Sequence, residues 1–180
     1  RQMCIRDSGR ELYARRRCRR PPPGRAACSR RPPLESIQWP SNVTHLPIDL
    51  IDPDDCAQKL GGDATADVSH VVFSALFGVE IGDPDEMEAN DAMLRNLVEG
   101  LEAGGAPLQH INVMQGRKAY GVHVRPESVT TWPLKESQPR DDHESWYWLQ
   151  EDYINAKTQS PDTTWSATFW RTATIAGYAY

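Results

Sequence analysis

Apolar residues along the chain fall into strand-length runs that alternate with segments of helical period. Residues 68–76 (VSHVVFSAL) form an almost continuous apolar run, which is typical of a strand buried on both faces. Residues 108–114 (LQHINVM) predict a second strand of this kind. Between them, apolar side chains recur at steps of three and four over residues 83–103, which predicts a helix that ends at Gly104 and Gly105.

The rest of the chain continues this alternation. Residues 26–29, 43–50 and 164–175 are predicted strands, and residues 144–157 are a predicted helix. Another helix begins at Asp52 and Pro53, with acidic residues in its first turn, and stops at Gly61. Strands that alternate with helices favour an α/β fold, in which a doubly wound parallel sheet is covered on both faces. Ligands of such sheets bind at the carboxyl ends of the strands.

Composition narrows the class of protein. With 39% hydrophobic and 25% charged residues in 180, the chain suits one soluble globular domain. No apolar run is long enough to span a bilayer, and the first residues have no apolar core typical of a secretion signal. The four cysteines include no Cys-x-x-Cys pair and suggest no disulfide framework. We therefore expect a cytoplasmic protein with no membrane partner.

Charge divides the chain into two parts. Residues 1–33 carry 11 arginines against two acids, a net +9, whereas the remainder carries 9 bases against 23 acids, a net −14. A basic arm often binds nucleic acid. This one has a single aromatic residue, five prolines and no helical period, and MCIRD at residues 3–7 resembles a translated transposon end used in sequencing-library preparation. We therefore expect residues 1–23 to be a non-native or disordered tail, residues 24–180 to fold, and no nucleic-acid partner.

Candidate binding residues follow the predicted strands. Ser29, Arg30 and Arg31 come where a dinucleotide fold ends its second strand, and guanidinium groups there suit the 2′-phosphate of NADP. The alternative is that both arginines belong to the basic arm. Asp49 and Leu50 follow the next strand, where they could hold an adenine or simply cap a helix.

Two further positions at strand ends are small residues. Ser74 and Ala75 end the run at residues 68–76, so they would lie near the ribose and the nicotinamide of a bound cofactor. Tight packing of small side chains explains them equally well.

Residues 113–153 contain the most specific signal. A strand, Ala-Tyr-Gly, Glu-x-x-Pro and then a tyrosine follow one another as in extended short-chain dehydrogenases. The tyrosine is Tyr147, but Glu151 stands four residues later, where those enzymes have lysine, and Lys118 stands beside the preceding strand. With GRKAYG at residues 116–121 and SWYWLQED at residues 145–152, the chain resembles the progesterone 5β-reductase and iridoid synthase-like family of atypical short-chain dehydrogenases/reductases.

The resemblance implies a Rossmann-like domain of an NADPH-dependent reductase that acts on C=C bonds beside a carbonyl. Tyr147 would be the hydrogen-bond donor to the carbonyl oxygen, and Lys118 the cation that favours the phenolate and holds the ribose hydroxyl groups of the cofactor. A small-molecule enone would be the substrate, and a homodimer is one assembly open to the full-length protein. Ser145, Trp148 and Ser74-Ala75 depart from the family pattern and put the substrate pocket in question.

One departure concerns the cofactor site itself. The Gly-x-x-Gly-x-x-Gly turn after the first strand is missing, because only Gly9 and Gly24 precede Gly61. The family also continues beyond Tyr180 into a substrate-covering region. We therefore expect a partial Rossmann-like domain, an internal fragment of a longer enzyme that is inactive alone.

Two other functions remain open. Tyr153 and Lys157 form a Tyr-x-x-x-Lys pair, which a nucleotide-sugar epimerase or dehydratase requires. A non-catalytic NADP-binding module is the second alternative. The five histidines have no ligand spacing, so we expect no metal site, and Asn90 on an apolar helix face is expected to hydrogen bond buried backbone.

Overall fold

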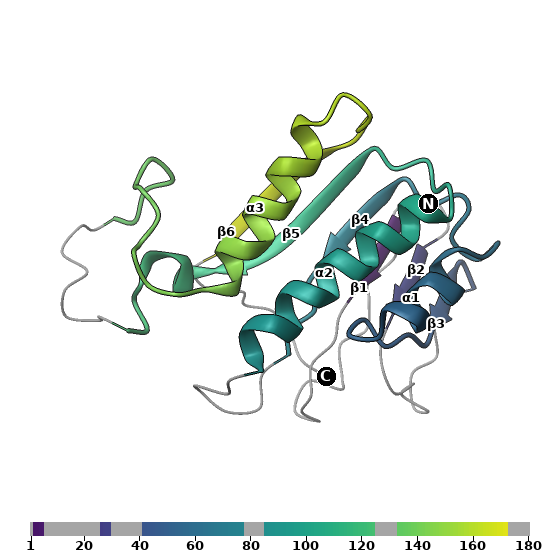
Figure 1. Cartoon of the computed structure of the whole chain (residues 1–180), viewed down its shortest axis with the longest axis horizontal. Helices are drawn as coiled ribbons and strands as arrows, with labels where there is room; N and C mark the ends of the chain where they lie inside the picture. The colour runs from purple at the N-terminus through teal and green to yellow at the C-terminus, as the bar shows by residue number, and fades with distance from the viewer. Residues whose placement is uncertain (1, 6–25, 30–40, 78–84, 125–132, 173–180) are drawn as a thin grey trace.

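Within the described residues, the strands form one six-stranded parallel sheet (Figure 1). The computed structural model describes residues 2–5, 26–29, 41–77, 85–124 and 133–172 of the chain. The strands are β1 (Gln2–Ile5), β2 (Ala26–Ser29), β3 (Val43–Leu46), β4 (His70–Phe73), β5 (His110–Gly116) and β6 (Ser166–Thr172). Their order across the sheet is β3-β2-β1-β4-β5-β6, and every neighbouring pair is parallel. This is the strand order of dinucleotide-binding folds, so the predicted α/β class is confirmed.

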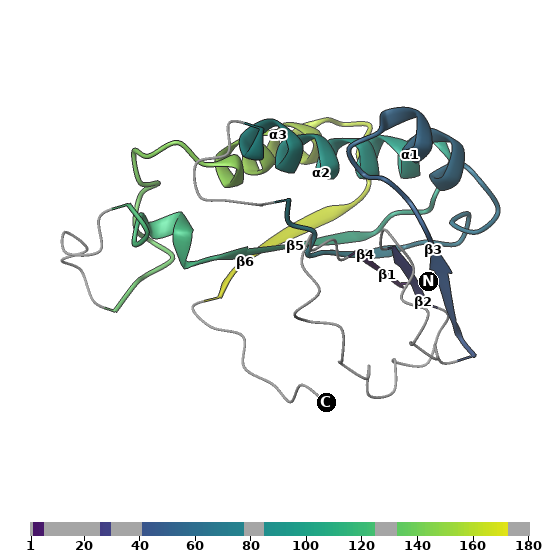
Figure 2. The same cartoon turned by 90° about the horizontal axis from the view of Figure 1, so that it is seen from below.

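Three helices cover one face of the sheet (Figure 2). They are α1 (Pro53–Leu60), α2 (Glu86–Ala103) and α3 (Trp146–Gln159), and a short 3-10 helix, η2 (Arg117–Tyr120), follows β5. The segments that join β1 to β2 and β2 to β3 lie outside the described residues, so the expected cover of the second face stays a prediction. In the part of the chain that the structure describes, no helix is long and apolar enough to cross a membrane.

The helix boundaries have local causes. The Asp52 carboxylate accepts hydrogen bonds from the N–H groups of Asp54 and Asp55 at 2.9 and 3.2 Å, which caps the start of α1. Helices α1 and α2 end at Gly61 and Gly104, as the sequence predicts. Strand β3 stops at Leu46, earlier than expected, because Pro47 has no N–H to donate to a neighbouring strand.

The core lies between the sheet and these helices. Strands β4 and β5 present alternate residues to it, rather than being evenly buried on both faces as the continuous run at residues 68–76 predicts, and α2 contributes its predicted apolar stripe. The members of the core that are no more than 1% exposed include Val71, Phe73, Met93, Leu94, Leu97, Leu101, Ile111 and Val113.

Strand β1 lies inside the segment expected to be a non-native or disordered tail, residues 1–23. Gln2–Ile5 pairs with both β2 and β4, and the expectation for residues 1–23 stays a prediction. Met3, Cys4 and Ile5 are a short apolar run, a composition typical of a central strand in a parallel sheet. All but Arg1 of the arginines in the basic arm follow this run, and residues 6–25 lie outside the described part.

A close approach of α1 and α2 gives a test of this packing. A Cβ atom on Gly104 would lie 2.6 Å from the carbonyl oxygen of Leu60 and 2.8 Å from Cα of Gly61, and neither backbone atom can swing away. We expect Gly104→Ala to lower the free energy of unfolding by about 1–3 kcal/mol. At Gly62 the nearest atom to a new Cβ is 3.8 Å away, so Gly62→Ala should be nearly neutral. Urea unfolding of the two variants compares them, and equal losses would contradict the packing described.

Candidate active site

The carboxyl end of β5 leads directly into the turn that carries Lys118. Gly116 ends the strand, η2 spans Arg117–Tyr120, and Gly121 closes the turn in the left-handed region with φ 69°. A side chain on Gly121 would also collide with the Asp141 carboxylate, whose nearest oxygen would lie 2.6 Å from its Cβ. The glycine of the predicted Ala-Tyr-Gly motif is therefore required twice, by conformation and by space.

Tyr147 reaches the same strand end from the start of α3. The hydroxyl of Ser145 accepts a 3.3 Å hydrogen bond from the Tyr147 N–H and so caps the helix, a role that Asn would fill equally well. The phenol oxygen of Tyr147 would lie 3.5 Å from a Cβ built on Gly116. Burial raises the pKa of Tyr147 above its ordinary value, although a hydrogen bond from the Gly116 backbone lowers it in part. The phenol is thus protonated at neutral pH and able to donate.

Trp146 connects the two predicted catalytic side chains. The ammonium of Lys118 lies 4.9 Å from the centroid of the indole ring, and the Tyr147 ring lies 5.3 Å from Trp146 in an edge-to-face arrangement. Lys118 and Tyr147 therefore share one aromatic neighbour at the carboxyl end of β5. The roles assigned to them stay a prediction.

The competing pair, Tyr153 and Lys157, lies elsewhere. Tyr153 is 8% exposed within the core cluster, its hydroxyl is 3.5 Å from Glu99 on α2, and Arg95 stacks 4.4 Å from its ring centroid. Lys157 forms a 2.7 Å ion pair with Glu102, also on α2. Burial and the Glu99 charge both raise the pKa of Tyr153. This pair packs α3 against α2.

The predicted cofactor residues occupy strand ends with mixed exposure. Ser29 is the last residue of β2, whereas Arg30 and Arg31 lie outside the described residues. Ser74 and Ala75 directly follow β4, with Ala75 buried and Ser74 half-buried.

Asp49 and Leu50 already form hydrogen bonds within the protein. The Asp49 carboxylate accepts a 3.2 Å hydrogen bond from the Ile51 N–H, and its backbone N–H donates to Asp55 at 2.7 Å. Leu50 is 2% exposed, and its carbonyl accepts a 2.9 Å hydrogen bond from Asn96. The alternative reading of Asp49 as a turn residue thus has direct support, while the adenine contact stays a prediction.

Asn90 holds the loop after β4, as expected of a buried polar residue. Its amide accepts a hydrogen bond from the Phe77 N–H at 2.9 Å and donates to the Phe77 and Glu86 carbonyls, both at 2.7 Å. Gln150 on α3 donates to the Asn90 carbonyl at 2.8 Å. The end of β4 is thereby fixed relative to the helix that carries Tyr147.

Loss of this amide should be costly. We expect Asn90→Ala to lower the free energy of unfolding by about 1–3 kcal/mol, because the variant removes the amide that hydrogen bonds the backbone of Phe77 and Glu86. Asn155 lies exposed on α3, so Asn155→Ala is a matched control that should change little. Thermal unfolding measures both, and an Asn90→Ala variant as stable as the control would contradict the account.

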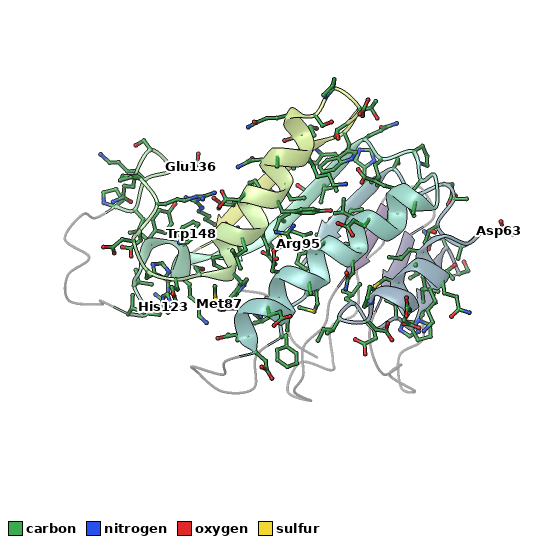
Figure 3. The ribbon with its side chains drawn as sticks, in the orientation of Figure 1. Asp63, Met87, Arg95, His123, Glu136 and Trp148 are labelled. Carbon is green, nitrogen blue, oxygen red and sulfur yellow. The ribbon has the colours of Figure 1, made fainter. Side chains whose placement is uncertain are left out.

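The ion pairs of Glu151 could not be predicted from the sequence. Glu151, which stands where related dehydrogenases have lysine, is buried and pairs with Arg140 and Arg171. Arg140 follows Pro139 and Arg171 lies in β6, so no spacing along the chain links them. Figure 3 places Trp148, the aromatic neighbour of both arginines, at the same end of the molecule as His123. Among the described residues no cluster of His, Cys, Asp and Glu could hold a metal ion.

Solved structures with the same fold bind nicotinamide dinucleotides. A dTDP-glucose 4,6-dehydratase of Streptomyces venezuelae, solved with NAD bound, superposes with a TM-score of 0.62 at 14% identity, over 93% of this chain and 55% of that one. A UDP-glucose 4-epimerase of Bifidobacterium longum, in complex with NAD+ and UDP, gives 0.60 at 12% identity, over 94% of this chain and 52% of that one. At such identities the likeness concerns the fold alone.

Relatives found by sequence similarity identify the family more specifically than the shared fold does. The chain is 30% identical over 140 residues to an (S)-8-oxocitronellyl enol synthase of Nepeta racemosa, which covers 76% of this chain and 35% of the relative. It is 28% identical over 127 residues to a 3-oxo-Delta(4,5)-steroid 5-beta-reductase of Arabidopsis thaliana, covering 69% and 32%. The chain thus spans about a third of the length of the curated relatives it matches. No family model matches it. The predicted resemblance is confirmed: the chain is a homologue of the iridoid synthases and steroid 5β-reductases, the atypical short-chain dehydrogenases/reductases.

Proposed function

We propose that the full-length protein is an NADPH-dependent reductase of C=C bonds conjugated to a carbonyl, and that this chain supplies its catalytic pair. The observation that carries the proposal is the placement of Tyr147 and Lys118 around Trp146, at the carboxyl end of β5. The homology to an enol synthase and a 5-beta-reductase supports the reaction class. The substrate is a small molecule that carries an enone or enal.

The chemistry follows from the two side chains. NADPH, when bound, supplies a hydride to the β-carbon of the substrate. Charge then develops on the carbonyl oxygen, and the neutral Tyr147 phenol donates a hydrogen bond that stabilises the developing enolate. The Lys118 ammonium is suited to hold ribose hydroxyl groups. Its positive charge would also favour the phenolate form of Tyr147. Glu151 cannot replace it, because a carboxylate has the opposite charge.

The described residues fit the nicotinamide end of such a cofactor. A phenol and an ammonium stand at the end of β5, and the backbone after β4 is fixed by Asn90. The preference for NADPH over NADH rests on Ser29 with Arg30 and Arg31, whose guanidinium groups match a 2′-phosphate.

The nucleotide-sugar epimerase or dehydratase is the second candidate, favoured by the fold of two solved relatives. Its Tyr-x-x-x-Lys chemistry would have to use Tyr153 and Lys157, whose polar groups are engaged with α2. A non-catalytic NADP-binding module would show affinity without turnover. Steady-state assays on the full-length protein separate the three. We expect NADPH oxidation to depend on a conjugated enone, with NADH a poorer hydride donor. Nucleotide sugars should be neither epimerised nor dehydrated.

This chain alone should bind NADPH weakly. The pyrophosphate of a dinucleotide normally sits on backbone amides of a glycine-rich turn at a helix N-terminus, and the sequence offers no such turn. Titration followed by cofactor fluorescence should show no saturation at micromolar concentration. Tight, saturable binding would mean that another segment supplies the anion site.

A further inference from the structure

Glu151 lies one helical turn after Tyr147 and is almost fully buried, with 6% of its side chain exposed. Its two oxygens bind different arginines. One accepts a 3.2 Å hydrogen bond from Arg140 Nε and lies 3.1 Å from Arg140 Nη2, and the other accepts a 2.7 Å hydrogen bond from Arg171 Nη2. A single carboxylate therefore joins α3 to the loop that precedes it and to β6.

The two arginines extend this connection to the turn that carries Lys118. Both guanidinium groups lie against the Trp148 ring, Arg140 at 5.2 Å and Arg171 at 5.5 Å from its centroid. The Arg171 guanidinium also lies 5.8 Å from the centroid of the Tyr120 ring. Tyr120 is the last residue of η2, two positions after Lys118. A continuous set of contacts thus runs from α3 through Glu151, Arg171 and Tyr120 to η2.

The charge of Glu151 is essential to this arrangement. Arg171 is only 19% exposed, and Glu151 is the acid with which it pairs among the described ion pairs. Arg140 also pairs with Asp152 at 2.7 Å, but that carboxylate is 65% exposed and contributes little. Removing one partner of a buried ion pair leaves an uncompensated charge, so a neutral side chain at position 151 should release Arg171.

We propose that Glu151 is a positioning residue: through Arg171 and Tyr120 it holds the turn that carries Lys118 in place against the start of the helix that carries Tyr147. The consequence for catalysis rests on the proposed function, whereas the positioning itself does not. At the position where related dehydrogenases have their catalytic lysine, this chain has an acid that fixes the displaced lysine from a distance.

Lysine NMR measures this placement directly. The chain has four lysines, Lys59, Lys118, Lys135 and Lys157, so reductive ¹³C-methylation labels these four side chains and the α-amino group, and Lys118→Arg identifies the Lys118 signal. Lys118 lies on η2 and its neighbour Trp146 lies on α3, with 4.9 Å between the ammonium and the ring centroid. The ring current of Trp146 therefore shifts the Lys118 signal only while the two elements keep their spacing.

We expect Glu151→Gln to move the Lys118 signal most of the way to the position of a free lysine, and Glu151→Asp, which keeps the charge, to restore much of the shift. Glu102→Gln is the matched control: it breaks the ion pair with Lys157 and should move the Lys157 signal alone. An unchanged Lys118 signal in folded Glu151→Gln would overturn the proposal.

A milder variant covers the case in which Glu151→Gln unfolds. Tyr120→Leu removes the aromatic ring that Arg171 contacts and leaves the ion pair between Arg171 and Glu151 in place. We expect a partial loss of the Lys118 shift in this variant, and a full shift would overturn the proposal. The measurement needs neither cofactor nor substrate, so a failure of the proposed reaction cannot be mistaken for a failure of the positioning.

Discussion

Replacing Tyr147 with phenylalanine in the full-length enzyme is expected to lower turnover by about 10²–10³-fold, the usual cost of losing one donor to a developing oxyanion. The affinity for NADPH should change little, because the phenol acts on the substrate oxygen in the transition state. Steady-state NADPH oxidation with a simple conjugated enone gives turnover, and fluorescence titration gives the affinity.

Tyr153→Phe is the matched control on the same helix. Its hydroxyl makes one long contact, 3.5 Å to Glu99, and its ring packs in the core, so turnover should be nearly unchanged. If Tyr153→Phe were inactive and Tyr147→Phe active, the assignment of the catalytic pair would be wrong and the epimerase-type reaction would take its place.

Lys118→Ala should impair two steps at once. The ammonium is proposed to bind cofactor hydroxyl groups and to influence Tyr147, so both NADPH affinity and turnover should fall. A hydrogen bond to a charged group contributes about 1.5–3 kcal/mol, which corresponds to a loss of affinity of roughly 10- to 100-fold.

The same two assays measure the Lys118 variant. Lys157→Ala is its control, since that lysine pairs with Glu102 on α2. Reduced turnover with unchanged NADPH affinity in Lys118→Ala would remove the cofactor-binding half of the proposed role.

Periodicity was sufficient to predict the fold. The apolar runs that contain β4 and β5 are of strand length, the stripe of α2 has a helical period, and a parallel sheet follows from their alternation. The exception is β1. Gln2–Ile5 is only four residues long, and the arginine-rich segment that follows it determines the composition of this part of the chain.

The candidate site was less accessible from sequence. Lys118 and Tyr147 belong to local motifs, so both could be named in advance. The partners of Glu151 could not, because Arg140 is 11 residues away in a polar loop and Arg171 is 20 residues away in β6. Asp49 could be named from the sequence, but its role could not, because an aspartate at a strand end can either stabilise a turn or bind a ligand. The structure gives direct evidence only for the turn.

Isotope transfer tests the central claim most directly. The full-length enzyme would be supplied with NADPH deuterated at C4 of the nicotinamide, on each face in turn, and with a conjugated enone. The account predicts a saturated carbonyl product with deuterium at the β-carbon from one of the two cofactors and a solvent proton at the α-carbon. Deuterium at the carbonyl carbon, or no transfer of deuterium to the enone from either cofactor, would contradict it.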